Sequence, residues 1–199
     1  MKVRFWGVRG NIVMPGPFTI KYGGNTSCIE VRGDNEELLI IDAGTGLREL
    51  GMYLAQTDCK KGPIITPILL THTHWDHIQG FPFFTPPAYL PSSEITFYGP
   101  VNQGDSLQAV VAGQMQYSYF PIKLDELKAR IYFKEVEEKE INIGNFRITT
   151  KYLNHPVIVL GYRIQYGNKV IVTMFDTEPY IDDVNEKQNG IIKNVEDFD

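Results

Sequence analysis

Three of the chain's four histidines lie within six positions, together with an aspartate, in the segment His72-Thr73-His74-Trp75-Asp76-His77. Side chains two residues apart in an extended segment point to the same side, so His72 and His74 can converge on one metal ion. Asp76 and His77, one turn further on, would face a second ion beside it. Packing alone gives no reason to bury several unpaired ionisable groups, which costs free energy. The segment therefore predicts a metal site.

The ligand types indicate which metals such a site would take. Neutral imidazole and carboxylate suit Zn, Mn or Fe, whereas thiolate-binding metals would need cysteine. The two cysteines, Cys28 and Cys59, are far apart and lack the spacing of a zinc knuckle or a redox motif. The fourth histidine, His155, and the aspartate Asp176 each follow an expected strand, a position that often carries functional groups. A histidine alone at such a position is usually structural or solvated.

The elements that must position these residues alternate between strand and helix patterns. Residues 63–71 form a nearly continuous apolar run, which predicts a strand buried on both faces that leads directly into His72. Leu47, Leu50 and Leu54 have the spacing of one helix face, which predicts a helix over residues 47–56. Further strands are expected over residues 3–8, 27–32, 38–42, 94–98, 130–136, 140–143, 146–153, 160–166 and 169–174, and further helices near residue 76 and over residues 105–117 and 182–195.

Length and charge restrict the class of protein. At 199 residues and 43% hydrophobic content, the chain is expected to form one domain over residues 1–199. A formal net charge of −5 disfavours a surface that grips long nucleic acid, although two divalent cations would offset much of that charge for a small anion. Neither a secretory signal nor an apolar run of about 18 residues is present, so we expect no membrane association and a cytoplasmic, reducing location.

Several residues near the cluster have two interpretations. Asp42 is either a turn residue at the end of a strand or a carboxylate that accepts the distal N–H of a ligand histidine. The turn Gly44-Thr45-Gly46 could cradle a phosphate, but we favour a steric need for glycine. Arg9 is either structural or a contact for a substrate phosphate. The loop that carries Asn25 and Thr26 is either structural or a wall of the site with substrate contacts.

The motif His72-x-His74-x-Asp76-His77 resembles, in full, the H-x-H-x-D-H signature of the metallo-β-lactamase superfamily. Residues 5–10 (FWGVRG), 22–27 (YGGNTS), 42–46 (DAGTG) and 176–178 (DTE) resemble its phosphodiesterase-like bacterial branch, near ribonuclease Z and the cyclic-phosphate phosphodiesterases. The resemblance implies an α/β fold, a four-layer αββα sandwich with the site at one edge of two facing sheets.

The resemblance also divides the metal ligands between two divalent ions, with Zn or Mn expected and Fe possible as a third choice. His72, His74 and His155 would bind the first ion, Asp76 and His77 the second, and Asp176 would bridge the two. Asp76 is in addition the expected catalytic residue, because it could orient the nucleophile. A homodimer is likewise implied by the resemblance.

One departure from the family concerns the end of the chain. The family places a further ligand histidine after the bridging aspartate, and this chain reaches Asp199 without one. Either the chain lacks the C-terminal portion of the fold, which we favour, or another group completes the second metal site, or the second ion binds weakly.

The expected activity is metal-dependent hydrolysis by a hydroxide that bridges two metal ions. The expected substrate is a small anionic phosphodiester, above all a small cyclic nucleotide or related cyclic phosphate. Alternatives are an RNA-processing endonuclease of the ribonuclease Z type, a thioesterase or lactonase of the same superfamily, and a metal- or ligand-binding module without catalysis. Long nucleic acid is not expected to bind, because no basic insertion is present to hold it.

Overall fold

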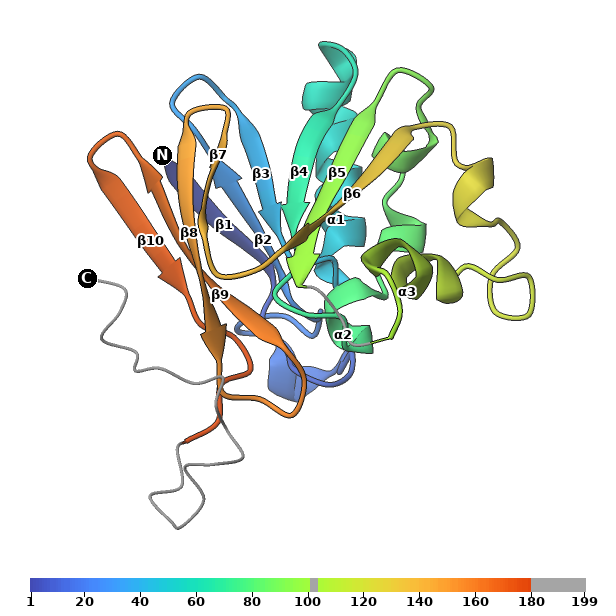
Figure 1. The fold of residues 1–199 in the computed structure, drawn as a ribbon. Coiled ribbons are helices and arrows are strands. Elements are labelled where there is room, and N and C mark those ends of the chain that lie inside the picture. Colours follow the sequence, from blue (N-terminus) through green and yellow to red (C-terminus); the bar gives the residue numbers. More distant parts are fainter. Residues whose placement is uncertain (101–103, 180–199) are drawn as a thin grey trace.

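A computed structural model describes residues 1–100 and 104–179, and in it two β-sheets lie face to face with helices on one side (Figure 1). The larger sheet has the strand order β1-β2-β3-β4-β5-β6, and the smaller has the order β10-β9-β8-β7. The strands are β1 (Lys2–Gly7), β2 (Cys28–Arg32), β3 (Leu38–Ile41), β4 (Ile65–Leu69), β5 (Glu94–Pro100), β6 (Arg130–Val136), β7 (Glu140–Ile143), β8 (Phe146–Leu153), β9 (Val159–Tyr166) and β10 (Lys169–Thr173). Every strand expected from the sequence is present.

The helices α1 (Gly46–Gln56) and α3 (Leu107–Gly113) cover the outer face of the six-stranded sheet, and the short helix α2 (Trp75–Ile78) lies at its lower edge (Figure 1). The apolar face predicted for the first of them is fully buried at Leu47, Leu50 and Leu54. Short 3-10 turns complete this layer and the loops: η1 (Pro17–Thr19), η2 (Asp58–Lys60), η3 (Phe81–Phe83), η4 (Pro87–Tyr89) and η5 (Leu124–Glu126). No helix among the described residues is long and apolar enough to cross a bilayer.

Helix α3 is shorter than the helix predicted over residues 105–117. Ser106 caps its N-terminus, since the Ser106 side chain accepts a hydrogen bond from the Ala109 N–H at 3.2 Å. Its last residue is Gly113, a poor helix former. The helix predicted over residues 182–195 lies outside the described residues.

Strand β4 lies between two hydrophobic cores. Ile68 packs in the core between the six-stranded sheet and the helices, and the next residue, Leu69, packs in the core between the two sheets. Both are fully buried, as predicted for a strand covered on both faces. Ile65, at the start of the strand, is 65% exposed, so this double coverage applies only to the end that leads into His72.

The described residues therefore form a helix layer and two sheet layers, the α/β fold with two facing sheets expected from the resemblance. In this part of the chain no helix covers the outer face of the four-stranded sheet, so three of the four expected layers are described. The ends of β3, β4, β8 and β10 meet at one edge of the sandwich (Figure 1, lower edge). This edge carries the cluster of histidines and aspartates.

Candidate metal centre

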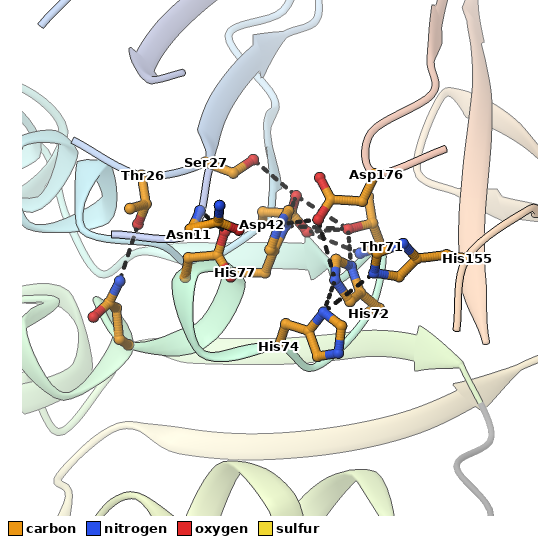
Figure 2. A network of polar contacts seen from close by, with 12 residues as sticks. Asn11, Thr26, Ser27, Asp42, Thr71, His72, His74, His77, His155 and Asp176 are labelled. Carbon is orange, nitrogen blue, oxygen red and sulfur yellow. Dashed lines mark hydrogen bonds and ion pairs between the residues drawn. The ribbon is translucent and has the colours of Figure 1, made fainter. Parts of the chain in front are cut away.

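Four strand ends supply the side chains of the cluster (Figure 2). Asp42 follows β3, the histidine segment follows β4, His155 follows β8 and Asp176 follows β10. Residues separated by more than a hundred positions thus meet at one edge of the two sheets. The sequence predicted each of these positions as a strand end, and the fold brings them together.

Three imidazoles and one carboxylate form the first group of possible ligands. The Nε2 atom of His72 lies 3.0 Å from Nδ1 of His74, which in turn lies 3.2 Å from Nε2 of His155. Asp176 completes the group, with its Oδ2 atom 3.6 Å from His72 Nε2. One donor atom from each of the four residues lies within 4.8 Å of the others. Imidazole lone pairs that point toward one another repel unless a proton or a metal ion lies between them.

The second group contains Asp76, His77 and, again, Asp176. Nε2 of His77 lies 3.4 Å from Oδ2 of Asp76 and 3.4 Å from Oδ2 of Asp176. Asp176 is therefore common to both groups. This is the arrangement that the resemblance implied for a bridging aspartate.

The hydrogen bonding of His77 fits a metal ligand. Its Nδ1 atom lies 2.8 Å from Oδ2 of Asp42, a fully buried carboxylate that can only accept when ionised, so Nδ1 carries the proton. The Nε2 atom is buried and has no hydrogen-bond partner among the described residues. This nitrogen and the two carboxylates that it faces are arranged as ligands around a cation, and a metal ion would take the place of the Nε2 proton.

Asp42 lies in a turn, and its carboxylate also contacts the imidazole of His77. Its backbone has a φ of 60°, in the left-handed region that Asp tolerates in turns. Its side chain accepts hydrogen bonds from Ser27 Oγ at 2.8 Å, from the Thr71 N–H at 2.8 Å and from Thr71 Oγ1 at 3.0 Å, in addition to His77. Because these donors hold the carboxylate in place, it orients the imidazole of His77.

The surroundings of His72 and His77 shift the pKa values of these two residues in opposite directions. Burial lowers the pKa of His77, but the carboxylates of Asp42, Asp76 and Asp176 outweigh this and raise it to about 9. Burial and then the neighbouring imidazoles of His77, His74 and His155 lower the pKa of His72 to about 2. In the absence of metal, His72 is thus a neutral donor at physiological pH.

Asn11 contacts the cluster through its backbone, which the sequence analysis missed. Its N–H donates a hydrogen bond to Oδ2 of Asp76 at 2.7 Å (Figure 2). The φ of Asn11 is 66°, and the N–H of Ile12 bonds the carbonyl of Gly10 at 2.8 Å, which makes a γ-turn. No residue-type signal could reveal a backbone donor from a loop 65 positions away. Thr71 and Ser27, which bond Asp42, were missed as well, although Thr71 adjoins the histidine segment.

The three predicted substrate contacts differ in accessibility. Arg9 lines a cavity together with His77 and Asp176. Asn25 accepts a hydrogen bond from Thr45 Oγ1 at 3.1 Å and so helps to hold its loop. Thr26 is fully buried, and its hydroxyl oxygen accepts from the Thr45 N–H at 2.8 Å. A substrate contact does not fit Thr26, because no surface of this residue is accessible.

The turn Gly44-Thr45-Gly46 is structural. A Cβ atom at Gly44 would lie 2.3 Å from the carbonyl oxygen of Asp76, closer than real contacts allow. The N–H groups of the turn donate to Ser27 O, Thr26 Oγ1 and Thr26 O at 2.8, 2.8 and 3.3 Å. None of the three is left to hold a phosphate, so the steric explanation is confirmed.

Fold and site together define an α/β metal-binding protein with a histidine and aspartate centre at the edge of two facing sheets. A family model described as "Beta-lactamase superfamily domain" matches residues 38–192. The chain belongs to this family, the metallo-β-lactamase superfamily, and its cluster is a metal-binding site of the kind found in that fold.

Individual relatives cover the chain only in part. It is 30% identical over 154 residues to Ribonuclease Z of Lactococcus lactis subsp. cremoris (strain MG1363), a match that covers 73% of this chain and 46% of that protein. The chain thus spans about half the length of the curated relatives that it matches.

Solved structures show the same fold. The metallo-beta-lactamase fold protein YhfI from Bacillus subtilis has a TM-score of 0.59 and 19% identity, and the match covers 85% of this chain and 59% of YhfI. Unliganded yeast PDE1 has a TM-score of 0.56 and 17% identity, and the match covers 95% of this chain and 68% of PDE1. At these identities the likeness concerns the fold alone.

Proposed function

We propose that the protein is a metal-dependent phosphodiester hydrolase whose site holds two divalent ions. The observation that carries the proposal is Asp176, whose carboxylate belongs to both groups of donor atoms. A carboxylate shared between two adjoining donor sets can bridge a pair of metal ions. A single structural ion would need only the first group.

The proposed ligands divide as the two groups do. His72, His74 and His155 would hold one ion, Asp76 and His77 the other, and Asp176 both. Zn or Mn is the proposed metal, with Fe as a further choice, because the donors are imidazole and carboxylate without thiolate. Bound cations of this kind supply Lewis-acid polarisation of a phosphoryl oxygen and a water of lowered pKa.

The chain's own residues would orient the reacting groups. Asp42 holds His77 in the tautomer whose free nitrogen faces the site. The Asn11 N–H donates a hydrogen bond to Oδ2 of Asp76, and no residue of the described part of the chain hydrogen-bonds the other oxygen of that carboxylate. We assign Asp76 the role of the catalytic residue that accepts a hydrogen bond from the attacking water and so directs it toward phosphorus.

We propose a small cyclic nucleotide or related cyclic phosphate as the substrate. The formal net charge of −5 disfavours a polyanion, since an extended nucleic acid would need a basic surface along its backbone. The cavity beside the site, of about 310 Å³, matches a small molecule. The match to Ribonuclease Z supports a second candidate, cleavage of RNA, which breaks the same type of bond.

Turnover with added Zn or Mn tests the proposal. The substrates to compare are cyclic mononucleotides, a bis-aryl phosphodiester, a structured RNA with a 3′ extension and a thioester. We expect the cyclic nucleotides to be hydrolysed and the thioester to be left intact. Turnover of the RNA alone would favour the second candidate, and turnover of the thioester alone would refute phosphodiester hydrolysis. A homodimer is a separate proposal that light scattering tests.

A further inference from the structure

A cavity of about 310 Å³ adjoins the metal centre between strand β1 and the end of strand β10. We call it the β1 cavity. His77 and Asp176 line it, so it opens directly onto the second group of metal ligands. Its other walls come from three segments: residues 5–10, Ser27 and Ile29 at strand β2, and Met174 with Phe175. The lining residues that matter here are Phe5, Val8 and Arg9 from the first segment and Met174 and Phe175 from the last.

The walls of the β1 cavity combine polar groups with apolar side chains, and two of the apolar side chains are aromatic rings. Phe5 is 62% exposed and Val8 is 48% exposed, although both belong to or adjoin a strand of the main sheet. Phe175 packs partly against the core between the sheets and completes the opposite wall. Exposed aromatic surface beside a polar site is typical of a pocket that receives a flat apolar group.

Arg9 adds one cation to these walls. Its Nη2 atom contacts Met14 Sδ at 3.0 Å, and its Nε atom is buried without a hydrogen-bond partner. Within residues 1–100 and 104–179 no carboxylate forms an ion pair with Arg9. A guanidinium that lacks an anionic partner next to a metal centre can bind an anionic oxygen of a ligand, for which its planar donors are suited.

We propose that the β1 cavity binds the organic group of the substrate, a single planar group of nucleobase size, against Phe5, while Arg9 binds an anionic oxygen of the same molecule. This inference rests on the proposed function and names its substrate class: a mononucleotide-sized phosphoester. The volume lies at the low end of small-molecule pockets, about 300 to 1,000 Å³. His77 and Asp176 belong to both the metal centre and the cavity, so a phosphate at the metals places its attached group in the cavity.

Binding of product-like ligands tests the inference without turnover. The probes are adenosine monophosphate and ribose 5-phosphate, which share the phosphate and the sugar but differ in the base. Calorimetry on zinc-loaded protein should give about tenfold tighter binding of adenosine monophosphate, because stacking of a base on an aromatic side chain is favourable. The variant Phe5→Ala should remove this preference, and Phe5→Tyr should keep it.

One further variant tests the role of Arg9, and another serves as the control. Arg9→Ala should weaken both ligands about tenfold and leave the preference between them unchanged. Val3→Ala is the matched control, because Val3 lies on the same strand two residues earlier, is 38% exposed and does not line the cavity. It should bind both ligands as the unaltered chain does, and circular dichroism should show that all variants fold.

Equal binding of the two ligands would overturn the inference, and so would a preference that survives in Phe5→Ala. Unchanged affinities in Arg9→Ala would overturn the role of Arg9. These outcomes are independent of hydrolysis. A base preference that depends on Phe5 in a protein that hydrolyses no phosphodiester would refute the proposed activity and support the cavity as a nucleotide site.

Discussion

Asp42 and His77 form a buried pair in which Oδ2 of Asp42 lies 2.8 Å from Nδ1 of His77. The two residues are 35 positions apart, since Asp42 follows strand β3 and His77 lies in helix α2. Asp42 accepts a hydrogen bond from the Nδ1–H of His77, so the other ring nitrogen faces Asp76 and Asp176. This contact links the turn after β3 to the metal centre, and the stability of the pair should govern metal affinity.

The variant Asp42→Asn should weaken binding of the second metal ion about 10- to 100-fold, the usual effect of removing such a partner. The amide has one acceptor oxygen where the carboxylate has two, and its NH₂ group would face the donors of Ser27, Thr71 or His77. Calorimetric titration with Zn measures the affinity. Asp105→Asn, at an exposed aspartate, is the control and should titrate like the unaltered chain. Equal affinities in the two variants would contradict the role of Asp42.

The metal-free protein should lose stability as pH rises from about 6.5 to about 9. The pKa of His77 is raised from 6.5 to about 9, so in this window the folded state holds a proton that the unfolded state has released. The expected slope is about 1.4 kcal/mol per pH unit. His72 opposes this slope only near the lower end of the window, because its pKa of about 2 keeps it deprotonated in the folded state and the unfolded state, with a pKa of 6.5, has released most of its proton above about pH 7.5.

Urea unfolding in the presence of a chelator, repeated at several pH values, measures this slope. The variant His77→Gln should show a nearly flat dependence over the same window. A slope that is identical in the variant would mean that another group holds the proton.

Asn11 should tolerate glycine but not valine. The φ of 66° suits Gly or Asn, whereas a β-branched residue in that region is strained by about 1 to 2 kcal/mol. Asn11→Gly keeps the N–H that donates to Asp76 and should keep metal affinity. Asn11→Val should shift the turn, weaken this hydrogen bond and reduce affinity for the second ion. Titration of both variants with Zn tests the difference, and two indistinguishable curves would refute it.

Tyr162 stabilises the end of the strand that leads into the histidine segment. Its hydroxyl is fully buried and donates to the carbonyl oxygen of Leu70 at 2.6 Å. Tyr162→Phe should lower the free energy of unfolding by about 1 to 2 kcal/mol, because a buried carbonyl loses its partner. Tyr119→Phe, at a side chain that is 74% exposed, is the control in thermal unfolding. A melting temperature unchanged in Tyr162→Phe would show that the carbonyl finds another partner.

The sequence contained enough to predict the strands and the cluster, for identifiable reasons. Alternating and continuous apolar runs indicate which segments form strands. Turn residues such as Gly144 and Gly167, both at positive φ, indicate where the hairpins turn. His72 and His74 were predictable as neighbours because a local extended segment places them on one side. His155 and Asp176 joined them only through the family resemblance and the strand-end pattern.

Other features depend on contacts that no local pattern records. The hydrogen bond from Asn11 to Asp76 uses a backbone N–H, which every residue except proline carries. Ile65 is apolar but exposed, because an apolar run does not reveal where the covering layers end. Thr26 looked accessible in a polar loop, yet its packing against Thr45 buries it completely. The β1 cavity likewise requires the approach of β1 and β10, which belong to different sheets.

Elemental analysis of metal bound per chain tests the central claim most directly. After dialysis against Zn or Mn, the unaltered chain should retain two ions, and the double variant His72→Ala/His74→Ala should lose the ion of the first group. Trp75→Phe, within the same segment and 71% exposed, should retain both. An unaltered chain that binds no transition metal, or a double variant that retains as much metal as the unaltered chain, would contradict the claim.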